Sequence, residues 1–345
     1  MELSEMAVGT IRKQGENSPA DRSAISQDML PQITICADML KGTKAIRDKS
    51  TDYLPKNPKE AEEAYKTRLA RTTFFNAFDK TIKGLSGTAF RKPASVDTTN
   101  ETLLEHTENI DMVGTDLLTF AMNIFEEGLA LGAVGILVDM QTNDGVVTKE
   151  DEKNVGMRPY WVPVPMDSIL NWKTETVGGK IKLTQITILS YVEVDNGEFS
   201  TKIERQYRVY DNKNYQIWKH VIGTDGKEKE NEVSLASLGT HTLGEVPFVL
   251  FNANPEAFFI SSPPLIDLAY ENISHYQTRS DYLNSLHFAS VAVLALIGID
   301  PPVTDGDGQG ESEVIWGSDS IIYAPEGADI KFVEHQGKAI NASRQ

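Results

Sequence analysis

Histidine and cysteine side chains are the groups whose spacing would reveal a metal centre or a nucleophile. The chain has six histidines, namely His106, His220, His241, His275, His287 and His335. None of them lies in an H-E-x-x-H motif. The usual cysteine-based zinc sites need at least two cysteine ligands, and the chain has only Cys36. His275 and His287 lie on one predicted helix, about 18 Å apart along its axis, which is too far to share a metal. The sequence therefore predicts no metal site and no cofactor.

The glycine-rich motifs that bind phosphates or support a nucleophile are also absent from the sequence. No G-x-x-x-x-G-K-[ST] loop occurs, which argues against ATP hydrolysis. Gly84–Gly87 (GLSG) is too short for a G-x-S-x-G elbow. Gly128–Gly135 (GLALGAVG) lacks the dinucleotide-binding pattern, and it follows a predicted helix where that pattern requires a strand. We therefore predict a protein that is not an enzyme.

Carboxylates offer two further possibilities for chemistry. Glu193 with Asp195, or Asp167, could serve a carboxylate-dependent hydrolase, which stays an alternative function. Glu193 and Asp195 share one side of a predicted strand, but they adjoin a turn and we expect them to be exposed. Residues 305–311 (DGDGQGE) begin like a calcium loop, yet the twelfth position holds Trp316 instead of glutamate and no helix flanks the loop. An acidic loop tip is the better interpretation of that segment.

The composition is that of a globular protein with a strong excess of acid. The chain has 345 residues, and 33 Lys and Arg against 50 Asp and Glu give a formal charge of −17. Such a chain is a poor non-specific DNA binder, because affinity for a duplex comes mostly from cations that neutralise phosphates. The charge fits either simple solubility or a surface that lies near DNA without gripping it.

The sequence also limits the compartment. The lone Cys36 excludes an intramolecular disulfide, and its apolar surroundings (LPQITICADML) predict a buried thiol. The polar N-terminus lacks the apolar core of a signal peptide. The longest apolar run, Phe288–Ile299, is shorter than the roughly 20 residues that a membrane helix needs. We expect a protein that is assembled in the cytoplasm of the cell that makes it and that does not associate with a membrane.

The pattern along the chain predicts an α+β fold. Residues 1–30 are polar and predict a flexible arm, followed by a short helix within residues 31–50. Apolar residues at helical spacing predict one helix over residues 59–85 and another over residues 101–131, each ended by glycine.

Four basic residues share the first of these predicted helices, namely Arg68, Arg71, Lys80 and Lys83. Each pair is three residues apart and could share a face. They form either a modest positive stripe or, since acids are interleaved, an ordinary solvated face.

The middle of the chain is rich in β signals. Residues 133–139 (AVGILVD) predict a buried strand, and the prolines within residues 158–172 restrict that segment to a sheet edge. Residues 180–253 alternate strand patterns with Asn-Gly and Asp-Gly turns, which predicts an antiparallel meander curled into a small barrel or sandwich.

A long amphipathic helix is predicted over residues 265–290, with Ser262 as its cap and two prolines in its first turn. Strand-like segments follow at residues 291–299, 314–317, 320–324 and 329–334. Residues 337–345 begin another helical pattern with no stop signal, so we expect the chain to end inside an element.

The order of these elements resembles the portal proteins of tailed bacteriophages. Tyr53–Pro93, with its acidic helix entry, aromatic pair and Gly-x-x-Gly exit, resembles the N-terminal wing helix. Gly128–Asp139 (GLALGAVGILVD), then Arg158-Pro159-Tyr160 and Ile169–Trp172, resembles the strand region that follows. Residues 261–298 (SSPPLIDLAYENISHYQTRSDYLNSLHFASVAVLALIG) resemble the passage from wing through stem to clip. The resemblance covers roughly residues 53–345 and is closest to a subfamily often described only as phage proteins of unknown function.

The resemblance implies a portal fold with an N-terminal arm at residues 1–52 and a helical and β-rich wing at residues 53–260. A long stem helix would occupy residues 261–290, and a small β clip residues 291–336. The second stem helix would start in residues 337–345 and be truncated, with the crown and tunnel loop missing.

The function that the resemblance implies is a ring, usually of twelve copies, at one capsid vertex of the virion. The ring would be the DNA channel for genome packaging, ejection and head–tail joining. Its implied partners are further copies of the chain, double-stranded DNA in transit, the large subunit of the terminase motor, the major capsid protein and a head–tail adaptor. A head–tail adaptor or other virion structural protein is the alternative, although these are generally smaller and more β-rich.

The resemblance also implies two groups of contact residues. Channel-facing or subunit-interface candidates on the stem are Asp267, Glu271, Tyr276, Arg279, Tyr282 and Leu286. Candidates on the clip for contacts with a motor or adaptor are Asp305, Asp307, Glu311, Glu313 and Trp316.

Overall fold

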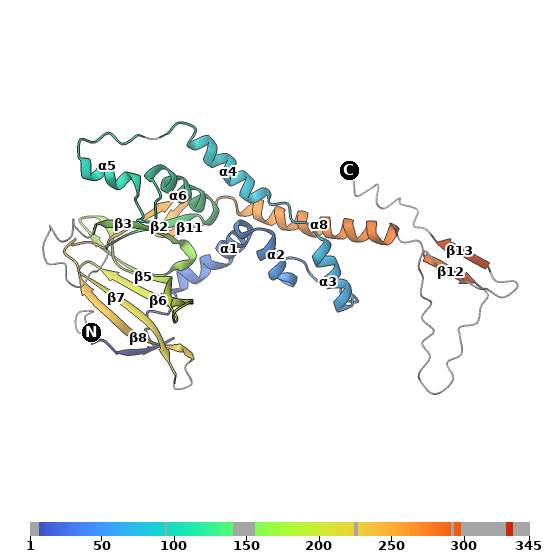
Figure 1. Ribbon diagram of the computed structural model, residues 1–345, viewed down its shortest axis with the longest axis horizontal. Helices are drawn as coiled ribbons and strands as arrows, with labels where there is room; N and C mark the ends of the chain where they lie inside the picture. The colour runs from blue at the N-terminus through green and yellow to red at the C-terminus, as the bar shows by residue number, and fades with distance from the viewer. Residues whose placement is uncertain are drawn as a thin grey trace. The chain divides into compact units, whose positions relative to one another are not determined.

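The computed structural model describes residues 7–93, 95–140, 156–223, 227–290, 293–297 and 329–333 (Figure 1). The chain divides into two compact units. Unit 1 comprises Met1–Lys49 and Phe74–Ile273, and unit 2 comprises Ser50–Thr73 and Ser274–Gln345. Helices and antiparallel strands are both present, which confirms the predicted α+β class.

A six-stranded antiparallel sheet forms much of unit 1. Its strands are β1 (Ile11–Lys13), β4 (Ile169–Val177), β5 (Lys180–Asp195), β6 (Thr201–Asp211), β7 (Asn214–Ile222) and β8 (Glu228–Thr240), in the order β1-β8-β7-β6-β5-β4. The predicted meander is therefore confirmed over residues 180–240, as a curled sheet with β1 and β4 at its edges (Figure 1), whereas residues 248–252 of the predicted range pair in another sheet. One core cluster on this sheet includes Trp218 and Leu235, which are 2% and 1% exposed.

The N-terminal residues are more ordered than the sequence predicted. Strand β1 hydrogen-bonds to the edge of β8, with Arg12 opposite Val233. Helix α1 (Ala24–Lys41) begins at the cap Ser23, whose side chain accepts a hydrogen bond from the Ser26 backbone N–H. The prediction of a flexible arm over residues 1–30 was wrong for these segments, because backbone pairing and a cap order a polar stretch that has little apolar content.

Short elements follow α1, namely α2 (Thr43–Asp48) and η2 (Ser50–Asp52).

Cys36 on α1 is completely buried, and burial raises the pKa of its thiol to about 12. The predicted buried thiol is thus confirmed.

A second sheet in unit 1 has the order β3-β2-β9. Its strands are β2 (Ala133–Met140), β3 (Pro159–Pro165) and β9 (Phe248–Asn252), and the 3₁₀ turn η3 (Met166–Ser168) leads from β3 to β4. The predicted strand after Gly132 is confirmed, and the proline-rich strand lies at an edge as expected. Nearby, β10 (Pro255–Ala257) pairs with β11 (Ile260–Ser261).

Each of the two long helices that the apolar spacing predicted is divided into two. The segment 101–131 forms α5 (Glu101–Glu108) and α6 (Leu117–Leu131), and the segment 59–85 forms α3 (Glu62–Arg71) and α4 (Ala77–Ala89). The physical reason is a cap inside each segment. The side chain of Asp116 accepts hydrogen bonds from the backbone of Leu118 and Thr119, and Asn76 accepts one from Asp79.

The glycines behave differently in the two helices. Gly84 and Gly87 do not end α4, which continues through them to Ala89. Gly132 does end α6, with a φ of +88° that favours glycine. A Cβ on Gly132 would also lie 2.7 Å from the carbonyl carbon and oxygen of Ser262. Only the last of these three positions therefore requires glycine.

Alanine substitutions at two of these glycines should have opposite effects. We expect Gly132→Ala to lower the free energy of unfolding by about 2–3 kcal/mol, from backbone strain and the clash with Ser262. Gly84→Ala, in a helix with open space around the position, should raise it by about 0.5–1 kcal/mol. Urea unfolding followed by circular dichroism measures both. Equal effects of the two substitutions would contradict this account.

Candidate functional site

The long helix predicted after Ser262 is α8 (Ile266–Ser290). Its buried residues are Ala269, Asn272, Tyr276 and Ser280, three or four positions apart, so they form a single stripe. Its exposed positions are Asp267, Tyr270, Glu271, Ser274, His275, Thr278, Arg279, Asp281, Ser285 and His287. The helix is therefore covered on one side and open to water on the other, as the sequence predicted.

The start of α8 differs in one detail from the prediction. Ser262 was predicted to be the N-cap, but α8 begins at Ile266, four residues later. The Ser262 hydroxyl instead accepts a hydrogen bond from the Asn254 side chain at 3.0 Å. The first turn is closed instead by the Ile266 backbone N–H, which donates to the Pro263 carbonyl at 3.2 Å. Two prolines still precede the helix, where their missing N–H groups cost nothing.

Asn272 holds the first half of α8 within unit 1. Its side-chain oxygen accepts a hydrogen bond from the Phe78 backbone N–H at 3.1 Å, and its side-chain nitrogen donates to the Phe75 carbonyl at 2.9 Å. Asn272 is 3% exposed, so both bonds lie away from water. The side chain thus satisfies the Phe78 backbone N–H, which is one of the first N–H groups of α4 and has no partner inside that helix.

The second half of α8 meets a buried ion pair in unit 2. Arg68 on α3 donates from Nε and Nη2 to the two carboxylate oxygens of Glu60, at 2.8 Å each. These side chains are 4% and 9% exposed. Arg68 also donates to the Ser280 hydroxyl at 3.2 Å, and Thr72 lies 3.0 Å from the same hydroxyl. The hydrogen bond from Arg68 holds the pKa of the Glu60 carboxyl below its ordinary value.

Of the two interpretations of Arg68, Arg71, Lys80 and Lys83, the positive stripe on one helix is not formed. The helix that was to carry it is divided, and Arg68 is buried against Glu60. Lys83 pairs with Asp79 at 2.8 Å, and the Lys80 ammonium lies 4.2 Å from the centroid of the Phe75 ring. Three of the four charges are therefore engaged within the chain.

Removing one member of the buried pair should destabilise unit 2. We expect Arg68→Met to lower the free energy of unfolding by roughly 2–4 kcal/mol, because it leaves the Glu60 carboxylate without its partner. The double variant Glu60→Gln with Arg68→Met should recover part of that loss. Lys66→Met, which removes an exposed partner of Glu63 on the same helix, should cost less than about 1 kcal/mol. Thermal unfolding would contradict the account if Arg68→Met and Lys66→Met behaved alike.

The candidate stem residues divide by exposure. Asp267, Glu271 and Arg279 lie on the open side of α8, and the Arg279 guanidinium lies 5.4 Å from the centroid of the Tyr282 ring. Tyr282 and Leu286 are partly buried. Tyr276 is fully buried within its own chain, so its inclusion as a channel-facing or interface residue was wrong. Its position on the helix coincides with the covered stripe, which its partly polar side chain did not reveal.

The segment after α8 contains one described strand pair. Strand β12 (Val293–Ile297) pairs antiparallel with β13 (Asp329–Val333), which confirms the strands predicted at residues 291–299 and 329–334. The register aligns Val293 with Val333. The clip candidates Asp305, Asp307, Glu311, Glu313 and Trp316 lie outside the described residues, as do the strands predicted at 314–317 and 320–324 and the segment 337–345.

The carboxylates considered for hydrolysis are not brought together. Glu193 and Asp195 are exposed near the end of β5, where the Thr201 hydroxyl donates to Glu193. Asp167 instead lies near Glu127 on α6, and burial together with the Asp167 charge raises the pKa of Glu127 to about 7. Sequence reasoning missed Glu127, which looks like an ordinary polar position on a helix. Among the described residues, no group of three or more potential ligands could hold a metal ion.

The raised pKa of Glu127 predicts how stability depends on pH. Between its ordinary value of 4.5 and about 7, the folded chain binds more protons than the unfolded chain, so stability falls as pH rises through that window. Glu127→Gln, which mimics the protonated acid, should be roughly 1–3 kcal/mol more stable than the original chain at pH 8. The difference should shrink towards pH 5. Glu126→Gln on the same helix is the control, and urea titrations at both pH values would refute the account if the two variants matched.

Comparison with known proteins adds one finding. A family described as a domain of unknown function (DUF4055) matches residues 264–345. The match begins just before α8 and includes β12 and β13, so it covers the helix and strand pair discussed above. No curated protein matches the chain. In the part of the chain that the structure describes, no helix is both long and apolar enough to cross a membrane.

Proposed function

We propose that this protein is a subunit of the portal ring of a tailed bacteriophage, the channel through which double-stranded DNA enters and leaves the capsid. The observation that carries the proposal is the one-sided burial of α8. A ring of identical subunits around a channel needs a rigid element that is anchored on one side and free on the other. The open side of α8 would then face a neighbouring copy or the water-filled channel.

The chemistry of the open side suits a passing duplex. Asp267, Glu271 and Asp281 are acidic, and the exposed Arg279 guanidinium lies 5.4 Å from the centroid of the Tyr282 ring. Each phosphate that a cation neutralises adds affinity, which would slow translocation. A surface with few free cations would therefore let DNA slide past, in keeping with a net charge of −17.

Exposed apolar side chains also support assembly. Phe199 and Ile203, at the hairpin between β5 and β6, are 92% and 72% exposed. Leu243 and Val249, near β9, are 62% and 61% exposed. Large apolar side chains left in water are available for contact with another protein. A closed ring requires two different surfaces on each copy, and these groups offer two candidates.

The proposal assigns the other parts of the chain by the same resemblance. The segment with β12 and β13 would be the clip, where a terminase motor or a head–tail adaptor would bind. The two sheets of unit 1 would belong to the wing, which would contact the major capsid protein. The assembled ring would lie at one vertex of the virion, and the chain itself would perform no catalysis.

The oligomeric state tests the proposal directly. We expect mass photometry to give a single high-order oligomer and negative-stain class averages to give rings with rotational symmetry. Monomers at all protein concentrations, or averages without rotational symmetry, would contradict it.

Charge reversal tests the role assigned to α8 in those rings. Asp267→Lys with Glu271→Lys should either reduce the yield of rings or raise their affinity for duplex DNA with a steeper salt dependence. The matched control Glu101→Lys with Glu105→Lys changes two exposed acids that are likewise four residues apart, on α5 of unit 1, and should do neither. If both double variants behave like the original chain, α8 does not line the channel or the subunit contact.

A further inference from the structure

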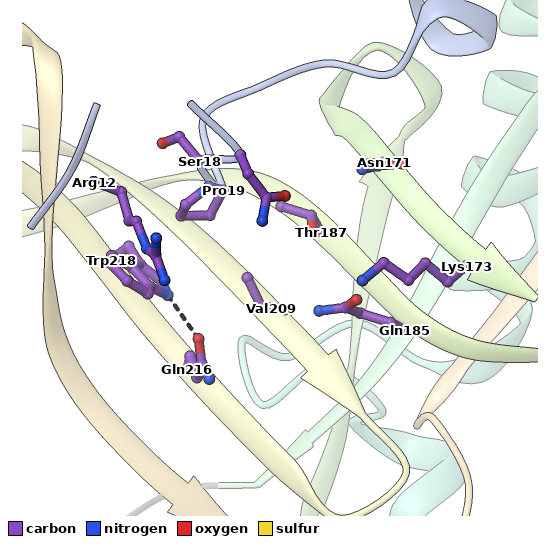
Figure 2. A pocket seen from close by; sticks show the side chains of 11 residues that line it. Arg12, Ser18, Pro19, Asn171, Lys173, Gln185, Thr187, Val209, Gln216 and Trp218 are labelled. Atoms are coloured by element: carbon purple, nitrogen blue, oxygen red, sulfur yellow. Dashed lines mark hydrogen bonds between the residues drawn. The ribbon is translucent and has the colours of Figure 1, made fainter. Parts of the chain in front are cut away.

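A polar cavity of about 160 Å³ lies on one face of the six-stranded sheet of unit 1 (Figure 2). The strand register places its lining side chains together. Asn171 is opposite Thr187, and Lys173 is opposite Gln185, so all four project from the same face of β4 and β5. Arg12 on β1 and the loop 17–19 of the N-terminal arm complete the wall. The cavity is therefore built from segments far apart in the sequence.

The cavity is lined by donors that have no partner. Within the described part of the chain, the Arg12 guanidinium, the Lys173 ammonium, the Gln185 amide and the Thr187 hydroxyl form no side-chain hydrogen bond or ion pair. Thr187 is only 7% exposed, so its hydroxyl has little access to water except through the cavity. Buried polar groups are normally satisfied, so the buried Thr187 hydroxyl is open to an acceptor inside the cavity. The half-buried Arg12 and the exposed Lys173 place two cations at the same hollow.

The charge of the cavity is the opposite of that of the chain. Eleven residues line it, and among them are two cations and no carboxylate. In the whole sequence, by contrast, the 50 acidic residues outnumber the 33 basic ones. The floor is fixed by Trp218, whose indole N–H donates to the side-chain oxygen of Gln216 at 2.9 Å (Figure 2). That bond occupies the amide oxygen of Gln216, the strongest acceptor on the floor.

We propose that this cavity binds a small oxyanion of the size of inorganic phosphate. Arg12 and Lys173 neutralise its charge from two sides, and the Thr187 hydroxyl and Gln185 amide donate to its oxygens. A volume of about 160 Å³ accommodates a single tetrahedral ion. Because Arg12 belongs to the N-terminal arm and Lys173 to β4, the bound ion joins the arm to the far edge of the sheet. The inference does not depend on ring formation.

Isothermal titration of the whole chain with inorganic phosphate, at constant ionic strength set by chloride, tests the inference. We expect saturable binding in the millimolar range, with a dissociation constant raised about tenfold by Lys173→Gln and by Arg12→Gln. Thr187→Val, which keeps the shape and removes the hydroxyl, should weaken binding several-fold. Hydrogen exchange of the backbone amides of residues 11–20 should slow when phosphate is added.

The matched control is Lys180→Gln, which removes the same charge from an exposed lysine on the same sheet outside the cavity. It should leave phosphate binding unchanged. Thermal unfolding without phosphate establishes that each variant is folded. Because Arg12→Gln could loosen β1, Lys173→Gln and Thr187→Val test the same cavity without changing that strand. Absence of saturable binding, or equal weakening by Lys173→Gln and Lys180→Gln, would overturn the proposal.

Discussion

The structure around α8 depends on hydrogen bonds from its buried face. Asn272 satisfies two backbone groups beside the start of α4 in unit 1, and Ser280 meets Arg68 and Thr72 in unit 2. An apolar stripe selects the side of a helix that is buried, but it fixes the rotation less sharply than a hydrogen bond, because hydrophobic contact is not directional. Directed hydrogen bonds away from water set the rotation of the helix. They therefore also decide which side chains remain open to solvent.

The position of the charges follows from that arrangement. Arg68 is neutralised by Glu60 inside unit 2, whereas the acids Asp267 and Glu271 stay on the open side of α8. The chain thus places a cation where it stabilises packing and leaves anions on the helix face that our proposal assigns to the channel. The two unpaired cations of the sheet cavity lie elsewhere, on unit 1, and serve a different purpose in our proposals.

The sequence predicted the elements better than their boundaries, and predicted their side-chain partners hardly at all. The strand after Gly132, the meander and α8 were expected because glycine, turn residues and apolar spacing are local signals. The division of two helices was missed because Asn76 and Asp116 cap new helices inside stretches whose apolar spacing continues across the break. The partners of Asn272 and Ser280 lie about 200 residues away along the chain, and no local pattern indicates them. Tyr276 was a candidate contact residue because the local pattern does not show that the chain itself buries it.

The pairing of β1 with β8 has a consequence for handling the protein. Strand β8 spans Glu228–Thr240 and would be an outer strand of the sheet without its short N-terminal neighbour. Backbone bonds from Gly9 to Gln14 cover the middle of that edge, from Asn231 to Leu235. An uncovered strand edge is a template for pairing with another chain. A purification tag that displaces residues 9–14, or a protease that removes them, would therefore expose the edge of β8 and favour aggregation over ordered assembly.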